Sequence, residues 1–185
     1  MSASPLGAPP AVEQVVLLDP AGEPVGVMDK AEVHTADTPL HLAFSCYAFD
    51  QRGRMLLTRR SLLKRTWPGV WTNTACGHPA PGEPIEEAVR RRLATELGLT
   101  PIALRPVLPD FRYRAVAPDG IVENEVCPVY FAELTGDPVP DPDEVMDWQW
   151  VDPAAFARTT VEAPFLLSPW SVLQVRGLLD AGVLR

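Results

Sequence analysis

The sequence has few cysteines, no excess of positive charge and no long apolar run. Its three cysteines, at positions 46, 76 and 127, cannot all pair and form no CxxC motif, which favours a reducing compartment and predicts a cytoplasmic protein. The net charge is -8, whereas a general nucleic-acid binder would show a basic face. No segment approaches the roughly 20 apolar residues that cross a bilayer, and the first residues lack the pattern of a secretory signal. We therefore expect neither nucleic acid nor membrane among the partners.

The hydrophobic residues make up 46% of the 185-residue chain, which is enough for one core without disulfide bonds. Three prolines within residues 1–11 predict a disordered lead. We expect residues 12–185 to form a single domain that is a monomer or a weak dimer.

Alternating and apolar runs predict a hairpin at residues 15–29 and strands at 42–49, 54–60, 70–78, 121–134 and 147–151, and a strand at 103–116 that Pro109 can break. The three prolines and five acids of residues 135–147 predict a solvated loop, whose acids are interpreted as solubilising residues. Helices are predicted at 83–97, where Gly98 provides the stop, at 153–158, and from Ser168 to about Leu179. The strands and helices alternate irregularly. This favours an α+β fold, an α/β/α sandwich with a central mixed sheet flanked by helices, over a doubly wound parallel sheet.

Two pairs of polar residues are spaced for one face of a strand, where residues i and i+2 point to the same side. Cys76 and His78 form one pair, and Glu123 and Glu125 form the other. Adjacent carboxylates repel unless a cation lies beside them. An economical explanation is a divalent metal, Zn, Mn or Mg, held by three imidazoles and two carboxylates: His34, His41, His78, Glu123 and Glu125. The alternative is scattered surface histidines and an exposed acidic strand, and spacing alone does not decide between the two.

The loop and helix after Cys76 carry a second pattern. Gly77, Glu83 and Arg91 fit G-x5-E-x7-R, which continues through Leu93, Glu96, Gly98 and Leu99. This resembles the Nudix box, whose helix presents carboxylates to a metal–diphosphate. Arg92 and Thr95 stand where the box has glutamates, so the resemblance indicates a Nudix-like fold more strongly than it indicates hydrolysis.

Further motifs narrow the resemblance. The segments TNTACGHP followed by GE, ENEVCPVYFA, the late SPW and the early K-x3-H-x6-H resemble type I isopentenyl-diphosphate isomerases over residues 14–175. The resemblance implies a Nudix-like fold that interconverts isopentenyl and dimethylallyl diphosphate, so the expected partner is a small isoprenoid diphosphate.

The resemblance also implies a role for individual residues. It assigns catalysis to Cys76 and Glu125, with support from Tyr113 and Trp170. It assigns a metal site to His34, His41, His78, Glu123 and Glu125, and a Mg²⁺ bridging the substrate diphosphate to Glu96. The diphosphate itself is expected on Lys30, Arg60, Lys64 and Arg92.

These residue types suit the implied chemistry. Moving a double bond adds one proton and removes another through a tertiary carbocation, so two proton-active groups such as Cys76 and Glu125 would suffice. An indole face such as that of Trp170 stabilises a cation by about 2 kcal/mol when desolvated, and an enclosed site keeps water from trapping the cation. Cys46 and Cys127 lie in apolar strands and are interpreted as core residues. Core packing is also the interpretation for Trp148, Trp150 and Trp67, and Glu83 and Arg91 are interpreted as a structural helix–loop pair.

Two rival functions remain open from the sequence. The first is a Nudix pyrophosphohydrolase, against which the missing carboxylates at positions 92 and 95 argue. The second is a non-catalytic sensor on a degenerate Nudix scaffold, against which the complete set of cysteine, histidine and glutamate residues argues.

Overall fold

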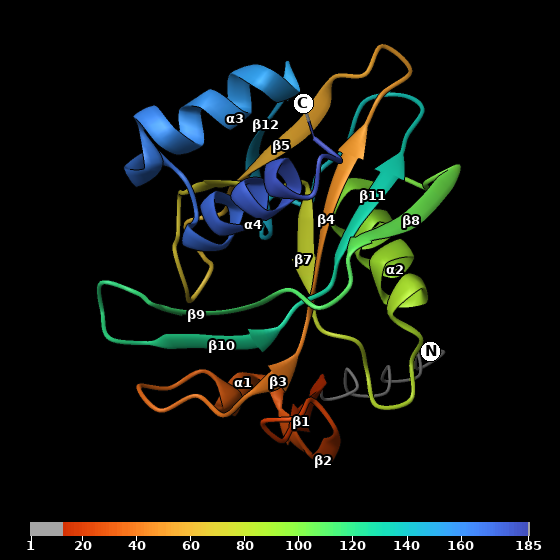
Figure 1. Ribbon diagram of the computed structural model, residues 1–185. Coiled ribbons are helices and arrows are strands. Elements are labelled where there is room, and N and C mark those ends of the chain that lie inside the picture. The colour runs from red at the N-terminus through yellow and green to blue at the C-terminus, as the bar shows by residue number, and fades with distance from the viewer. Residues whose placement is uncertain (1–12, 185) are drawn as a thin grey trace, which may run out of the picture.

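The computed structural model describes residues 13–184, which form two β-sheets, four α-helices and one 3-10 helix. The lead expected at residues 1–11 lies outside the described residues. The larger sheet has seven strands. Figure 1 shows α2 on one of its faces, α3 and α4 on the other, and the second sheet crossing below it. This is the predicted arrangement of a mixed sheet flanked by helices.

The larger sheet has the strand order β12 (Val145–Val151), β5 (Met55–Arg60), β4 (Phe44–Phe49), β11 (Val129–Glu133) and β8 (Ala103–Leu108). Strands β11 and β4 are parallel and the other neighbours antiparallel. Two short strands complete the sheet: β6 (Trp71–Thr72) pairs with β5, and β7 (Ala75–Gly77) pairs with β4.

The alternation of side chains along β4 distributes the core to both faces of this sheet. Phe44 and Cys46 pack with α2 (Ile85–Leu97). Tyr47 belongs instead to the cluster formed with α3 (Pro153–Glu162) and α4 (Pro169–Asp180). Full burial of each large apolar side chain contributes roughly 1.5–3 kcal/mol. Helix α2 ends where predicted, because Gly98 adopts φ 64°, a left-handed conformation that glycine takes without a Cβ clash.

The smaller sheet has the order β2 (Pro24–Asp29), β1 (Gln14–Leu18), β3 (His41–Leu42), β10 (Val122–Val126) and β9 (Arg112–Val116). The predicted hairpin is confirmed as β1 and β2, and the single turn of helix α1 (Lys30–Val33) follows it directly. Strands β3 and β10 are parallel, with Glu125 opposite His41.

Each of the four long strands predicted at 42–49, 70–78, 103–116 and 121–134 is two strands in the structure. Ala43 separates β3 from β4, and Cys127 and Pro128 separate β10 from β11. Pro128 has no N–H for a sheet hydrogen bond, and its carbonyl oxygen accepts from the amide of Ser45 at 3.0 Å. These two chain segments therefore pass from one sheet into the other, and so does the segment predicted at 103–116, from β8 (Ala103–Leu108) to β9 (Arg112–Val116). The sequence pattern did not reveal this change of sheet.

The strand predicted at 70–78 divides because it lies between β4 and β5. Those strands pair directly only at Ala48 with Leu56 and at Phe49 with Met55. Where they diverge, Thr74 bridges them: its Oγ1 accepts from the Ala48 amide at 2.8 Å and donates to the Leu56 carbonyl at 2.6 Å.

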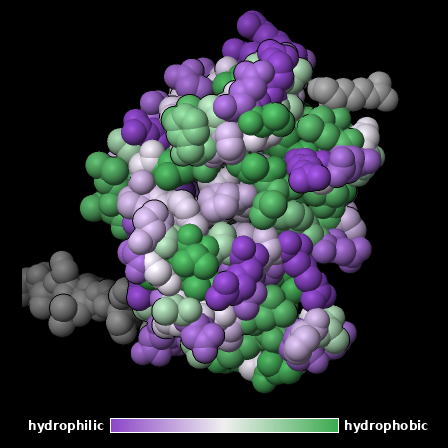
Figure 2. Space-filling view, turned by 60° about the vertical axis from the view of Figure 1, so that its left-hand side comes forward, coloured by the Kyte–Doolittle hydropathy of each residue, from purple (hydrophilic) through white to green (hydrophobic). Residues whose placement is uncertain are grey.

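Helix α3 extends to Glu162, beyond the predicted end at residue 158, because Phe156, Ala157 and Thr160 continue its buried face. The short 3-10 helix Pro164–Leu166 connects it to α4. Within the described residues, no helix is long and apolar enough to cross a membrane. Figure 2 shows hydrophilic side chains interspersed among hydrophobic ones on the face that it presents.

Candidate active site

A cavity of about 580 Å³ opens where the two sheets separate. It is lined by every residue that the sequence analysis placed in the site except His41 and Glu96. Glu125 and Tyr113 come from the smaller sheet, where they are directly paired. Cys76 comes from β7 of the larger sheet. The fold therefore brings together residues that are far apart in the chain.

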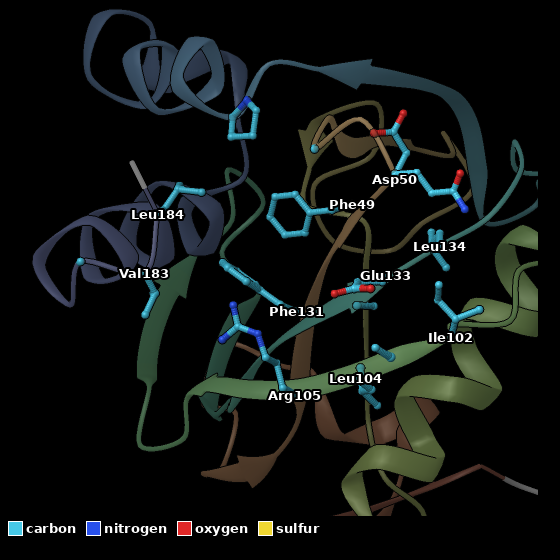
Figure 3. A pocket seen from close by; sticks show the side chains of 16 residues that line it. Phe49, Asp50, Ile102, Leu104, Arg105, Phe131, Glu133, Leu134, Val183 and Leu184 are labelled. Atoms are coloured by element: carbon cyan, nitrogen blue, oxygen red, sulfur yellow. The ribbon is translucent and has the colours of Figure 1, made fainter.

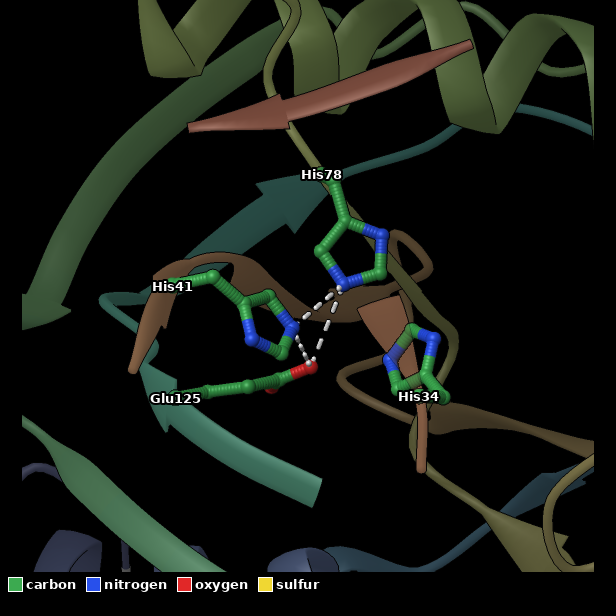
Figure 4. A group of neighbouring side chains, drawn as sticks. All are labelled: His34, His41, His78 and Glu125. Carbon is green, nitrogen blue, oxygen red and sulfur yellow. Dashed lines mark hydrogen bonds and ion pairs between the residues drawn. The ribbon is translucent and has the colours of Figure 1, made fainter. Parts of the chain in front are cut away.

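The three histidines of the chain converge on one carboxylate, as Figure 4 shows. Ligand atoms of His34, His41, His78 and Glu125 all lie within 4.8 Å of one another. The Nε2 atoms of His41 and His78 are 3.2 Å apart, and Glu125 Oε1 lies 3.5 Å from the first and 3.3 Å from the second. Such a group could hold a divalent metal ion, since imidazole nitrogen and carboxylate oxygen are common ligands of these ions.

The surroundings of His41 prepare it as a ligand. Its ring is fully buried, and Nδ1 lies 2.9 Å from the carbonyl oxygen of Pro39. Since that oxygen can only accept, Nδ1 carries a proton, and Nε2 is the ring nitrogen that faces the group. Burial works to raise the pKa of Glu125, but hydrogen bonds with His41 and His78 outweigh it and hold this pKa well below its usual range. The donor set thus fits a cation.

Glu123 and Glu96 lie outside this group of four. Glu123 Oε2 is 3.0 Å from His34 Nε2, and its Oε1 accepts from the Thr66 hydroxyl at 2.8 Å. Glu96 forms an ion pair with Arg92 one turn earlier on α2, as the i,i+4 spacing predicts. Burial raises the pKa of Glu96 although Arg92 acts in the opposite direction.

Cys76 and Trp170 belong to one connected wall of the cavity. Burial raises the pKa of the Cys76 thiol to about 11, so the thiol is protonated at neutral pH. The indole Nε1 of Trp170 donates to Asn73 Oδ1 at 2.9 Å. The ring of Tyr113 lies 6.1 Å from that of Trp170, and burial raises the Tyr113 pKa well above its ordinary value.

The basic residues expected to bind a diphosphate line the same cavity, and most of them contact acids. Lys30 Nζ is 2.5 Å from Glu13 Oε2, Lys64 pairs with Glu144, and Arg92 Nη2 lies 3.7 Å from the same Glu144 carboxylate. Arg60 instead donates to the main-chain oxygens of Thr66 and Trp67.

Several residues of the site were missed or misinterpreted from the sequence. The acids of residues 135–147 were interpreted as plain solubilising residues, yet Glu144 reaches the cavity mouth to pair with Lys64. Glu13 and Asn73 were given no role, although Asn73 lies within the quoted TNTACGHP motif. The interpretation of Glu83 and Arg91 as a structural pair is confirmed by contacts of 2.7 and 2.8 Å.

The remaining cysteines and Trp67 are buried, as the sequence analysis predicted. Cys46 and Cys127 are at most 1% exposed, and burial raises the pKa of both thiols. Trp67 packs against Trp170 in one buried cluster, with its ring 5.3 Å from that of Trp170 and nearly perpendicular to it.

A larger cavity, about 790 Å³, lies elsewhere on the seven-stranded sheet, beside β8 and β11 (Figure 3). Its lining includes Phe49, Phe131 and Leu104. Arg105 stacks over the Phe131 ring, and the Asp50 carboxylate is held by Arg54. It contains none of the predicted site residues. Except for His41 and Glu96, the predicted catalytic, metal-binding and diphosphate-binding residues line the smaller cavity, which we therefore take as the candidate active site.

Comparison with known proteins supports this assignment. A NUDIX domain family model matches residues 39–170. The chain is 58% identical over 174 residues to the isopentenyl-diphosphate Delta-isomerase of Paenarthrobacter aurescens, covering 94% of this chain and 95% of the relative. It is 58% identical over 175 residues to the isopentenyl-diphosphate Delta-isomerase of Frankia alni, covering 93% of this chain and 90% of the relative. It is 56% identical over 162 residues to the protein of the same name from Klebsiella pneumoniae, covering 88% of each chain.

Solved structures of lower sequence identity share the fold. The DR0079 protein from Deinococcus radiodurans superposes with a TM-score of 0.67 at 20% identity, covering 89% of this chain and 98% of its own. A MutT protein from Methanosarcina mazei gives 0.61 at 19% identity, with 78% and 96% covered. The chain therefore belongs to the NUDIX family and, within it, to the isopentenyl-diphosphate Delta-isomerases.

Proposed function

We propose that this chain interconverts isopentenyl diphosphate and dimethylallyl diphosphate. One observation carries the proposal: a thiol, Cys76, and a carboxylate, Glu125, reach one cavity from different sheets, beside a cluster of basic side chains. This is the arrangement needed to add a proton to one face of a small alkene and remove one from the other. The names of the relatives at 53–58% identity support the same reaction.

The two proton transfers use these two groups. In one direction the Cys76 S–H bond breaks, the alkene π pair forms a new C–H bond with that proton, and a tertiary carbocation results. The Glu125 carboxylate then removes a proton from the neighbouring carbon, and the pair of that C–H bond becomes the new double bond. The reverse direction exchanges the roles, so the geometry serves both.

The carbocation is stabilised by the aromatic wall. Trp170 is 3% and Tyr113 9% exposed, and both line the cavity. An aromatic face attracts a cation without attacking it, and the attraction is strongest where water is excluded. The same enclosure protects the cation from hydration.

The diphosphate is proposed to bind the four basic residues at the mouth: Lys30, Arg60, Lys64 and Arg92. Without substrate, Glu13 and Glu144 hold Lys30 and Lys64 in place. A diphosphate, with its higher charge and greater number of oxygens, would compete with these carboxylates for the same cations. We expect Mg²⁺ to accompany it, held by Glu96.

We assign one Mn²⁺, Zn²⁺ or Mg²⁺ to His34, His41, His78 and Glu125, with Glu123 as the fifth ligand. Four of these five residues already have their ligand atoms within 4.8 Å of one another. A bound cation supplies positive charge that fixes the carboxylate of Glu125 in one orientation. We further propose that the chain works in the cytoplasm as a monomer or weak dimer, with no nucleic-acid partner.

The test is incubation with isopentenyl diphosphate in heavy water, followed by NMR. We expect dimethylallyl diphosphate to form and deuterium to enter the allylic carbons. Cys76→Ala and Glu125→Gln should each nearly abolish the reaction while the circular dichroism spectrum stays unchanged. Near-full activity in either variant would refute the mechanism.

The rival function, pyrophosphate hydrolysis, is measured with the same protein preparation in separate incubations, as phosphate released from nucleoside diphosphate derivatives. Arg92 and Thr95 replace two carboxylates that the box supplies for such hydrolysis, so we expect none. Phosphate release without isomerisation would establish the rival.

A further inference from the structure

The sulfur of Cys76 is embedded in a network of fully buried polar side chains. Ser45 lies directly across from Cys76 in the β4–β7 pairing, with its Oγ 3.3 Å from Sγ. The amide Nδ2 of Asn73 lies 3.2 Å from the same sulfur. Both residues are 0% exposed, and a polar group is kept in such a place only with hydrogen-bond partners.

The partners of Ser45 determine where its hydroxyl hydrogen points. Gln174 Nε2 donates to Ser45 Oγ at 2.7 Å, and Gln174 Oε1 accepts from the Tyr47 hydroxyl at 3.0 Å. Because Ser45 is the acceptor from Gln174, its own hydrogen remains for a sulfur. Two sulfurs are within reach, Cys76 at 3.3 Å and Cys127 at 3.4 Å.

The partners of Asn73 determine whether its side-chain oxygen can also accept the Cys76 thiol proton. Asn73 Oδ1 accepts from the Thr72 hydroxyl at 2.8 Å and from the indole N–H of Trp170 at 2.9 Å. These two donors occupy both lone pairs of the oxygen. The Cys76 thiol lies 3.2 Å from Oδ1, but S–H is a weak donor and loses this competition. The thiol proton is therefore left for the cavity.

The geometry points to Ser45 as a positioning residue for Cys76: its O–H group donates to the sulfur and aims the thiol proton at the substrate. This inference rests on the proposed isomerisation. In either direction of that reaction the sulfur is a thiolate on one side of the proton transfer, holding the electron pair of the former S–H bond. The Ser45 hydroxyl aimed at the sulfur stabilises that thiolate in a buried place, as fixed donors stabilise other developing anions.

Asn73 acts instead through contact with the sulfur and through Trp170, because its amide oxygen holds the indole. Its Nδ2 contacts the Cys76 sulfur while its Oδ1 holds the indole. The amide is planar and rigid, so one side chain sets the proton donor and the cation-stabilising ring at a fixed separation. Asn73 also donates to the main-chain oxygens of Cys46 and Ala75. Its removal would therefore disturb the fold, and Ser45 provides the cleaner test.

The experiment compares Ser45→Ala with Ser45→Thr in the full-length protein, measuring kcat and KM for isopentenyl diphosphate. We expect Ser45→Ala to lower kcat by roughly 10- to 100-fold, the effect of losing one hydrogen bond to a charged group. KM should stay within about twofold, because the interaction is made during proton transfer. Ser45→Thr keeps the hydroxyl and should recover most of the lost kcat.

The matched control is Thr160→Val, which removes a buried hydroxyl in α3 that donates to Ala157 at 2.7 Å, outside the site. It should lose thermal stability without changing kcat. A wild-type kcat in Ser45→Ala would overturn the inference, and so would equal losses of kcat in Ser45→Ala and in the control. If Ser45→Ala fails to fold, Ser45→Cys decides: it fills the same space with the weaker S–H donor, and an unchanged kcat overturns the inference. Failure of the proposed function looks different, because the wild-type protein would then not isomerise the substrate.

Discussion

The guanidinium of Arg60 lies over the ring of Trp170, 5.3 Å from its centroid. Hydrogen bonds to the main chain of Thr66 and Trp67 hold it there. Arg60 thus joins two parts of the proposed site, the diphosphate subsite and the aromatic wall. A diphosphate bound to Arg60 would reduce the positive charge beside the indole and leave the ring better able to stabilise a carbocation.

Arg60→Lys tests this connection. Lysine keeps the charge but loses the planar stacking group and the forked hydrogen bonds. We expect KM for isopentenyl diphosphate to rise about tenfold, in line with the loss of one charge-assisted interaction, and kcat to fall as well. Steady-state kinetics measures both. The control is Arg59→Lys, since Arg59 is the neighbouring residue on β5 and does not line the cavity. Equal kinetics in both variants would contradict the role of Arg60.

Metal removal should destabilise the protein through the histidine cluster. A ligand present at 100 times its dissociation constant stabilises the folded state by about 2.7 kcal/mol. We expect added Mn²⁺ or Zn²⁺ to raise the midpoint of thermal unfolding and a chelator to lower it. His41→Asn should abolish both shifts and lower the bound metal measured by elemental analysis. Glu133→Gln, an exposed carboxylate of the other cavity, serves as control. If the His41 variant still shows the full shift of the unfolding midpoint on addition of metal, the histidine cluster is not the binding site.

Gly77→Ala tests the close approach of β7 to helix α2. A Cβ at this position would lie 2.9 Å from Arg92 Cγ and 3.1 Å from Phe44 Cζ. We expect a loss of about 1–3 kcal/mol in the free energy of unfolding, typical of overpacking, and a higher KM because Arg92 is displaced. Denaturant unfolding and kinetics provide the two measurements. At Gly26 an added Cβ meets only Leu17, at 3.9 Å, so Gly26→Ala should change neither quantity.

The pH dependence of stability should reveal the Glu83–Arg91 ion pair. Hydrogen bonding to Arg91 lowers the pKa of Glu83 in the folded protein although burial acts in the opposite direction. The folded pKa thus lies below the unfolded one. The stabilisation is complete above the unfolded pKa of about 4.3 and is lost as pH falls through the folded pKa. We expect Glu83→Gln to cost about 1 kcal/mol at pH 7, with the difference disappearing in acid. A difference that is constant with pH would exclude the ion pair as its cause.

The sequence predicted those features that depend on neighbouring residues. The helix ending at Gly98, the Arg92–Glu96 pair and the shared side of Glu123 and Glu125 all follow from local periodicity. The strand breaks at Ala43 and Pro128 did not, because an apolar run is the same whether it crosses one sheet or two. The contacts of Glu13, Glu144 and Asn73 were not predicted from the sequence either. Each of them joins segments that are far apart in the chain and meet only in the folded protein.

The passage of chain segments through both sheets also affects motion. Because β3 continues into β4 at Ala43 and β10 into β11 at Pro128, continuous backbone is shared by both sheets at these junctions, where Ala43 N–H donates to Val126 and Ser45 N–H to Pro128. We expect the amide hydrogens of these junctions to exchange with solvent mainly through global unfolding. The β1–β2 hairpin and α1 belong to the edge of the smaller sheet, and local opening there can admit the substrate while the reacting groups stay fixed.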